Sequence, residues 1–168
     1  VSGTLLIPLL YILMKRFGAD RAGSLTAALM LAIHPLHIWF SQEARPYVLL
    51  LFLTTSALLA LVAAFQHGRL RDWMLGGLLI YLAFLTHLVG LATLVIAWCW
   101  ALLLHRTRAA LGRLTALSLA LALLCAPWFV ALARRPEASH APARGLTLFE
   151  IPYTFQTFVG GYYPGPGP

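Results

Sequence analysis

Six apolar runs with almost no charge inside them constrain the fold of this sequence more than any other feature. They span residues 1–14, 23–40, 46–65, 73–87, 89–104 and 114–132. A helix needs about 20 apolar residues to cross a bilayer, and it satisfies its own backbone polar groups there. We therefore expect an all-α, polytopic transmembrane helical bundle with about six spans, of which the first, fourth and fifth are short.

Composition supports a membrane protein and argues against a nucleic-acid-binding one. The chain of 168 residues is 61% hydrophobic and 10% charged, with a mean hydropathy of +0.83, whereas soluble domains carry about 25% charged residues. Its net charge of +7 comes from short basic groups between the apolar runs rather than from one water-facing patch, and such groups are typical of topology signals. Membrane lipid is thus an expected partner, and nucleic acid is not.

The basic groups predict how the chain crosses the membrane. Eight of the twelve basic residues are Lys15, Arg16, Arg21, Arg69, Arg71, Arg106, Arg108 and Arg113. If all of them stay on the cytoplasmic side, the chain must cross twice within 73–104, which requires a turn near residues 87–90. Residues 41–45 and everything after Leu132 then face outward, although Arg134 and Arg135 count against this.

The two ends of the chain differ from its middle. We expect residues 1–132 to form the transmembrane region and the Pro- and Gly-rich residues 133–168 to form a truncated outer loop, with a short amphipathic helix at 148–158. The sequence starts inside an apolar run without an initiator Met, so we interpret the chain as a fragment.

The stretch "FSQEARPYVLL", residues 40–50, interrupts the apolar pattern with polar groups. Pro35 is expected to end the second span early, which leaves 34–40 as a short interfacial segment. Pro46 suits the first position of a helix, so the third span should begin there. Free backbone N–H groups at that helix start, together with the guanidinium of Arg45, predict an anion site, which Glu43 could orient or assist.

The same residues also allow plainer interpretations. Glu43 and Arg45 could form a solvated ion pair worth about 0 to 1 kcal/mol. His87, an ionisable residue inside an apolar run, is a candidate site residue, but it lies at a predicted turn that water can reach. His34 and His37 share a helical spacing, yet no third ligand accompanies them, which argues against a metal site.

One part of the sequence resembles a known family. "HPLHIWFSQEARPYVLLLFLTTSALLAL", preceded by "PLLYILMKRFGADRAGSLTAALMLAI", is similar to the bacterial protein O-mannosyltransferases, which are glycosyltransferases of the GT-C superfamily. The similarity is close over residues 5–65 and looser to about residue 105. It implies a GT-C-like fold and transfer of a sugar from a polyprenyl-phosphate donor to a protein, lipid or glycan acceptor, at the outer face of the bacterial inner membrane.

The resemblance also implies roles for individual residues. Arg45 would bind the lipid phosphate, and Glu43 would assist catalysis. The remaining donor-site residues would be Ser41, Gln42, Tyr47 and His87. The main catalytic carboxylate would precede Val1, so we expect this fragment to be inactive alone. No cofactor is implied with certainty, and a divalent metal is left open.

Two other functions remain as alternatives at this stage. In a transporter or flippase component, the outer Glu and Arg would gate a polar substrate, although the paired interrupted helices typical of transporters are not visible. In a non-catalytic membrane scaffold, the outer tail would bind a partner. Sugar transfer and assembly, measured on the same variants, separate the enzyme from the scaffold.

Overall fold

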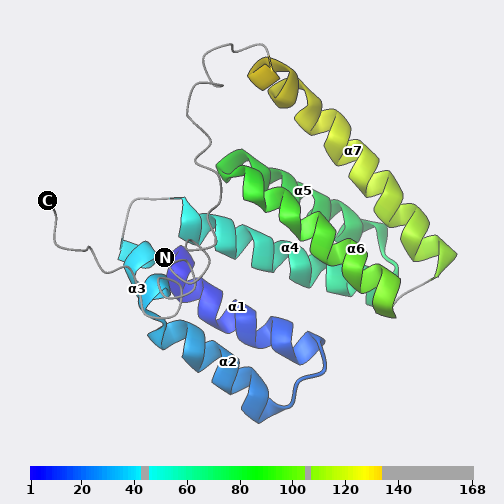
Figure 1. Cartoon of the computed structure of the whole chain (residues 1–168). Helices are drawn as coiled ribbons and strands as arrows, with labels where there is room; N and C mark the ends of the chain where they lie inside the picture. Colours follow the sequence, from blue (N-terminus) through cyan, green and yellow to red (C-terminus); the bar gives the residue numbers. More distant parts are fainter. Residues whose placement is uncertain (43–45, 105–106, 134–168) are drawn as a thin grey trace, which may run out of the picture.

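The computed structural model describes residues 1–42, 46–104 and 107–133, and these ranges are helical apart from short turns (Figure 1). The elements are α1 (Ser2–Arg16), α2 (Arg21–Ile33), α3 (Pro35–Gln42), α4 (Tyr47–His67), α5 (Leu70–Thr86), the 3₁₀ helix η1 (Leu88–Leu91), α6 (Ala92–Leu104) and α7 (Arg108–Ala133). Within the described ranges no strand occurs, so the all-α prediction is confirmed. The outer-loop prediction lies outside them, apart from Ala133.

The number of spans differs from the prediction of about six. Among the residues that the structure describes, only Tyr47–His67 and Arg108–Ala131 are single helices long and apolar enough to cross a membrane, and α2 with α3 can form a third, broken span. Helices α1, α5 and α6 have 15, 17 and 13 residues. At about 1.5 Å per residue, each is shorter than the roughly 30 Å of a hydrocarbon core.

The predicted breaks in the apolar runs occur close to their expected places. His34 is extended, and α3 starts at Pro35 with a bend of 55° relative to α2. The fourth and fifth runs separate at His87, where α5 ends and η1 begins. Helix α4 starts one residue later than predicted, because Pro46 is its N-cap rather than its first helical residue.

Single residues explain the start of α2 and the end of α4. The carboxylate of Asp20 accepts a hydrogen bond from the backbone N–H of Gly23 at 2.7 Å and caps the start of α2. Gly68 ends α4 with a φ of 66°, a left-handed conformation that favours glycine. Helices α1 and α2, and likewise α4 and α5, run antiparallel through these short connections (Figure 1).

Small residues bring α4 and α5 close together in the core. Gly76 of α5 lies against Leu61 of α4, so closely that an added Cβ would come within 2.9 Å of the Leu61 side chain. Close backbone approach at glycine and alanine is the usual packing of membrane helices. The buried core comprises Ala57, Leu61, Ala64, Trp73, Ile80, Ala97, Ala101, Leu114 and Leu121.

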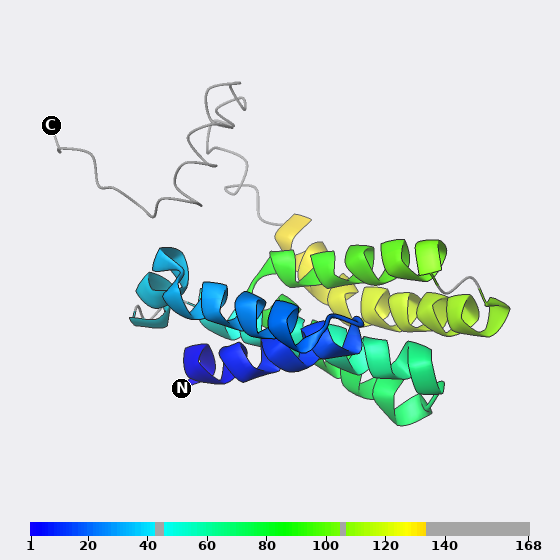
Figure 2. The same ribbon diagram turned by 90° about the horizontal axis from the view of Figure 1, so that it is seen from below.

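The antiparallel arrangement gives the bundle two chemically different ends (Figures 1 and 2). The α1–α2 and α4–α5 connections, the end of α6 and the start of α7 lie at one end, which we call the basic end. All Lys and Arg residues of the described ranges are there: Lys15, Arg16, Arg21, Arg69, Arg71, Arg108 and Arg113. At the opposite end lie α3, the start of α4, and the turn between α5 and α6. We call this the polar end, after its residues Ser41, Gln42, Tyr47 and His87.

Candidate functional site

The consecutive helices α3 and α4 meet the turn after α5, which is distant from them in sequence, at the polar end. The ring of Tyr47, in the first turn of α4, lies 5.0 Å from the ring of Phe40 on α3 and 6.1 Å from the ring of His87, measured between centroids. Tyr47 is 39% exposed. Glu43 and Arg45 lie outside the described residues, but Gln42 and Pro46 on either side of them are at this end.

His87 is oriented by the turn in which it lies. Its Nδ1 accepts a hydrogen bond from the backbone N–H of Val89 at 3.2 Å. In the neutral ring the proton is therefore on Nε2, which remains available as a donor. Because His87 is exposed, this donor can reach a ligand beside Tyr47.

A glycine makes that turn possible. A Cβ built on Gly90 would lie 2.5 Å from the carbonyl carbon and 2.7 Å from the carbonyl oxygen of Ala83, and also 2.7 Å from the backbone nitrogen of Phe84. Helix η1 therefore folds directly onto the last turns of α5, an approach that any larger residue would block. This contact sets the position of His87.

Ser41, near the end of α3, packs against the start of α1. Its hydroxyl donates to the backbone carbonyl of His37 at 2.6 Å, so its oxygen can only accept further hydrogen bonds. Its side chain also lies against Gly3 near the start of α1, where a Cβ would collide with it. The end of α3 is thus fixed to α1 immediately before residues 43–45.

An apolar cavity of about 620 Å³ begins beside Tyr47 and extends between the helices. This volume lies within the range of small-molecule sites. Its polar lining groups are few, with His34, His37, Tyr47 and Thr54 among otherwise apolar side chains. The apolar lining consists of Leu10, Ala27, Met30, Leu31, Leu36, Phe40, Val48, Leu50, Leu51 and Val89.

The two histidines of the broken second run contribute to this cavity. His34 lies at the break between α2 and α3, and His37 is a buried residue of α3. Within the described ranges, no three His, Cys, Asp or Glu side chains come close enough to hold a metal ion.

The sequence predicted Ser41, Gln42 and Tyr47 as one group because they are neighbours in the chain, and it also predicted His87 as a site residue. It did not identify Phe40 or Val89 as part of the site, although both line the cavity. The available signal was weak: Phe40 and Tyr47 are aromatic residues on either side of the polar stretch. No sequence signal connects Val89 with α3.

Comparison with known proteins identifies the family of the chain. Residues 1–134 match the family model described as dolichyl-phosphate-mannose-protein mannosyltransferase. The chain belongs to this family. The match includes α7. It therefore extends beyond residue 105, after which the sequence itself shared only its general layout with the family. No curated protein and no solved structure matches the chain significantly.

Family membership determines the broad class of the protein. It is a glycosyltransferase of the mannosyltransferase type, and its long apolar helices agree with an integral membrane protein.

Proposed function

We propose that the protein transfers a sugar from a polyprenyl-phosphate donor to an acceptor at the outer face of the bacterial inner membrane. The observation that carries this proposal is the position of Tyr47, which lines the apolar cavity and also contacts His87 at the polar end. A polyprenyl-phosphate sugar has a long apolar chain and an anionic head, so it needs these two environments side by side.

The residues of the polar end suit the chemistry of this transfer. An acceptor hydroxyl attacks the anomeric carbon, the bond from that carbon to the phosphate oxygen breaks, and the polyprenyl phosphate leaves with the electron pair. The departing phosphate needs positive charge and hydrogen-bond donors. Arg45 supplies the charge, and the first turn of α4, which has no side-chain cap, supplies backbone N–H groups.

The other polar residues complete the donor site. His87 donates from Nε2 to the phosphate or sugar, while Ser41, Gln42 and Tyr47 contact the donor head group. The proton of the acceptor hydroxyl goes to a carboxylate base, and Glu43 assists this step.

The charge distribution supports the membrane face in this proposal. The Lys and Arg residues of the described ranges lie at the basic end, and such residues favour the cytoplasmic side. The polar end then faces outward, where the transfer takes place.

Two matched tryptophan variants of the full-length enzyme test the proposal. Leu31 lines the cavity, whereas Leu29 of the same helix is 61% exposed and does not line it. Leu31→Trp fills space that the polyprenyl chain would occupy. Excluding two or three methylene groups, at about 0.8 kcal/mol each, raises the KM for a long-chain donor roughly 30-fold. Leu29→Trp leaves this KM unchanged.

Donor length separates a blocked cavity from a damaged protein. A short-chain donor analogue reaches less of the cavity, so Leu31→Trp should raise its KM by a smaller factor. An equal rise in KM with both donors would show that the polyprenyl chain does not bind in the cavity. Absence of sugar transfer by the wild-type enzyme would favour the transport or scaffold alternatives.

A further inference from the structure

Arg69 and Arg71 belong to the α4–α5 connection and the first turn of α5 at the basic end, and hydrogen bonds hold the segments of two further arginines beside them. The side chain of Gln66 donates to the backbone carbonyl of Arg16 at 3.3 Å, which attaches the end of α1 to α4. The guanidinium of Arg113 on α7 donates to the carbonyl of Gly68 at 2.5 Å. We call the set Arg16, Arg69, Arg71 and Arg113 the turn cluster.

The turn cluster carries more positive charge than its neighbours neutralise. Asp72 contacts Arg71, with 3.4 Å between Nε and Oδ1. The exposed side chains of Arg16 and Arg69 have no acidic partner among the described residues. Because like charges near one surface repel, an anion bound at this connection would lower the electrostatic free energy of the folded protein.

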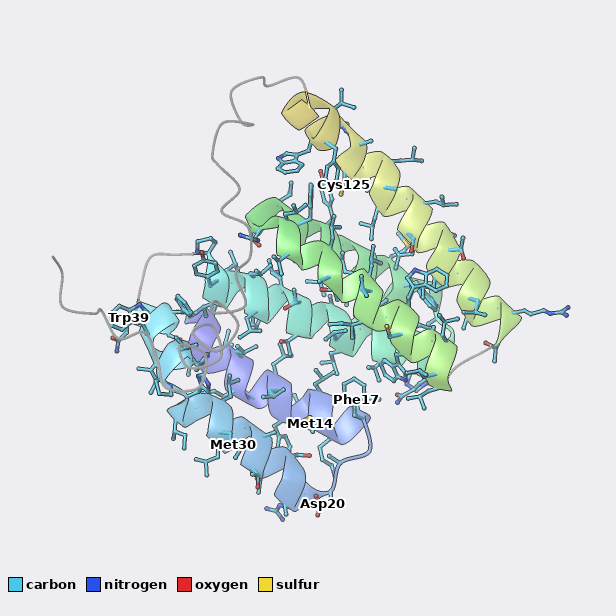
Figure 3. The ribbon with its side chains drawn as sticks, in the orientation of Figure 1. Met14, Phe17, Asp20, Met30, Trp39 and Cys125 are labelled. Atoms are coloured by element: carbon cyan, nitrogen blue, oxygen red, sulfur yellow. The ribbon has the colours of Figure 1, made fainter. Side chains whose placement is uncertain are left out.

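Apolar and aromatic residues next to the cluster indicate where that anion comes from. Leu70, between two of the arginines, is 70% exposed, and Phe17 is 47% exposed. The ring of Phe17 lies 4.7 Å from that of Trp100, and Figure 3 shows Phe17 at the end of α1. Exposed apolar and aromatic side chains beside guanidinium groups are typical of the interface between head groups and acyl chains, and a site for a soluble anion would not need them.

A buried hydrogen-bond donor, the indole of Trp73, lies in the first turn of α5 at the basic end. Trp73 is only 4% exposed, and its indole Nε1 has no hydrogen-bond partner. The ring of Phe65 connects it to the aromatic group, at 4.9 Å from Trp73 and 5.7 Å from Trp100. An unpaired buried donor is unfavourable, and its cost adds to the repulsion among the arginines of the same end.

We propose that the turn cluster binds the phosphodiester head group of an anionic phospholipid in the leaflet at the basic end. The ligand is separate from the sugar donor, and its site lies at the opposite end of the bundle from Tyr47. This inference does not depend on the proposed sugar transfer.

The test uses full-length protein in detergent micelles, titrated with phosphatidylglycerol or phosphatidylcholine, with thermal unfolding and native mass spectrometry as measurements. The double variant Arg16→Gln/Arg69→Gln removes two cations from the turn cluster. The matched control Arg21→Gln/Arg108→Gln removes two cations from the same end of the bundle but outside the cluster. At about 1 kcal/mol per basic residue near a membrane surface, the cluster variant should bind phosphatidylglycerol roughly 30-fold more weakly, and the control should match the wild type.

Each outcome decides for or against the site. Stabilisation of the wild type by phosphatidylglycerol but not by phosphatidylcholine, reduced only in the cluster variant, supports it. Equal effects of the two lipids, or equal losses in the two double variants, would overturn it. Inorganic phosphate stabilising the wild type as strongly as phosphatidylglycerol would instead identify a site for a soluble anion and also overturn the proposal. Because no step measures sugar transfer, failure here leaves the proposed enzymatic function untouched.

Discussion

Replacing Gly90 with alanine should disturb the candidate site from outside it. The added Cβ would meet three backbone atoms of α5 at 2.5 to 2.7 Å, whereas ordinary contacts begin at 3.4 Å. Backbone atoms inside a helix cannot rotate away as a side chain can, so η1 must move outward by almost 1 Å. Overpacking of this kind costs about 1 to 3 kcal/mol of stability.

The same movement should also change activity. Helix η1 contains Val89, whose N–H holds the ring of His87, so the ring moves with it. A displacement of about 1 Å in a catalytic site can reduce the rate roughly 100-fold. If His87 serves the donor, Gly90→Ala should lower kcat/KM for sugar transfer by between tenfold and 100-fold.

The assay compares transfer rate, membrane level and thermal unfolding of full-length Gly90→Ala and Gly112→Ala. A Cβ on Gly112 would meet nothing within 4 Å, and alanine in an exposed helix should stabilise by about 0.5 to 1 kcal/mol. Wild-type stability in Gly90→Ala would refute the packing argument. Reduced stability with unchanged kcat/KM would show instead that transfer does not depend on the position of His87.

Two further substitutions test the charged residues. Arg45→Ala should lower sugar transfer by at least tenfold while the protein stays in the membrane at its normal level, because the departing phosphate loses its cation. Near-normal transfer in a membrane-vesicle assay would exclude this role. Asp20→Ala should lower the free energy of unfolding by about 1 kcal/mol, measured by thermal unfolding, because the start of α2 loses its cap. Asp20→Asn keeps an accepting oxygen, so its free energy of unfolding should stay within a few tenths of a kcal/mol of the wild-type value. Equal losses in both Asp20 variants would show that charge, rather than capping, matters there.

Features with a local cause could be predicted from the sequence. Proline accounts for the break at Pro35 and, within one residue, for the start of α4, because it lacks an N–H and restricts the residue before it. The turn at residues 87–90 followed from the alternation of basic groups along the chain. The number of spans was overestimated because runs too short to cross a membrane were counted as spans. The runs 1–14, 73–87 and 89–104 became helices of 15, 17 and 13 residues, each shorter than the hydrocarbon core.

By itself, the sequence determined that this chain is helical and apolar, where proline breaks its second apolar run, and which short stretch holds its polar residues, since each of these depends on neighbouring residues. Only the tertiary structure decided that Tyr47 meets His87, that four helices and η1 line a cavity beside them, and that Arg113 reaches the α4–α5 connection. The physical reason is that helices such as α4 are apolar on nearly every face. Their hydrophobic pattern does not indicate which face meets which neighbour, and close contacts at small residues such as Gly76 and Gly90 decide it instead.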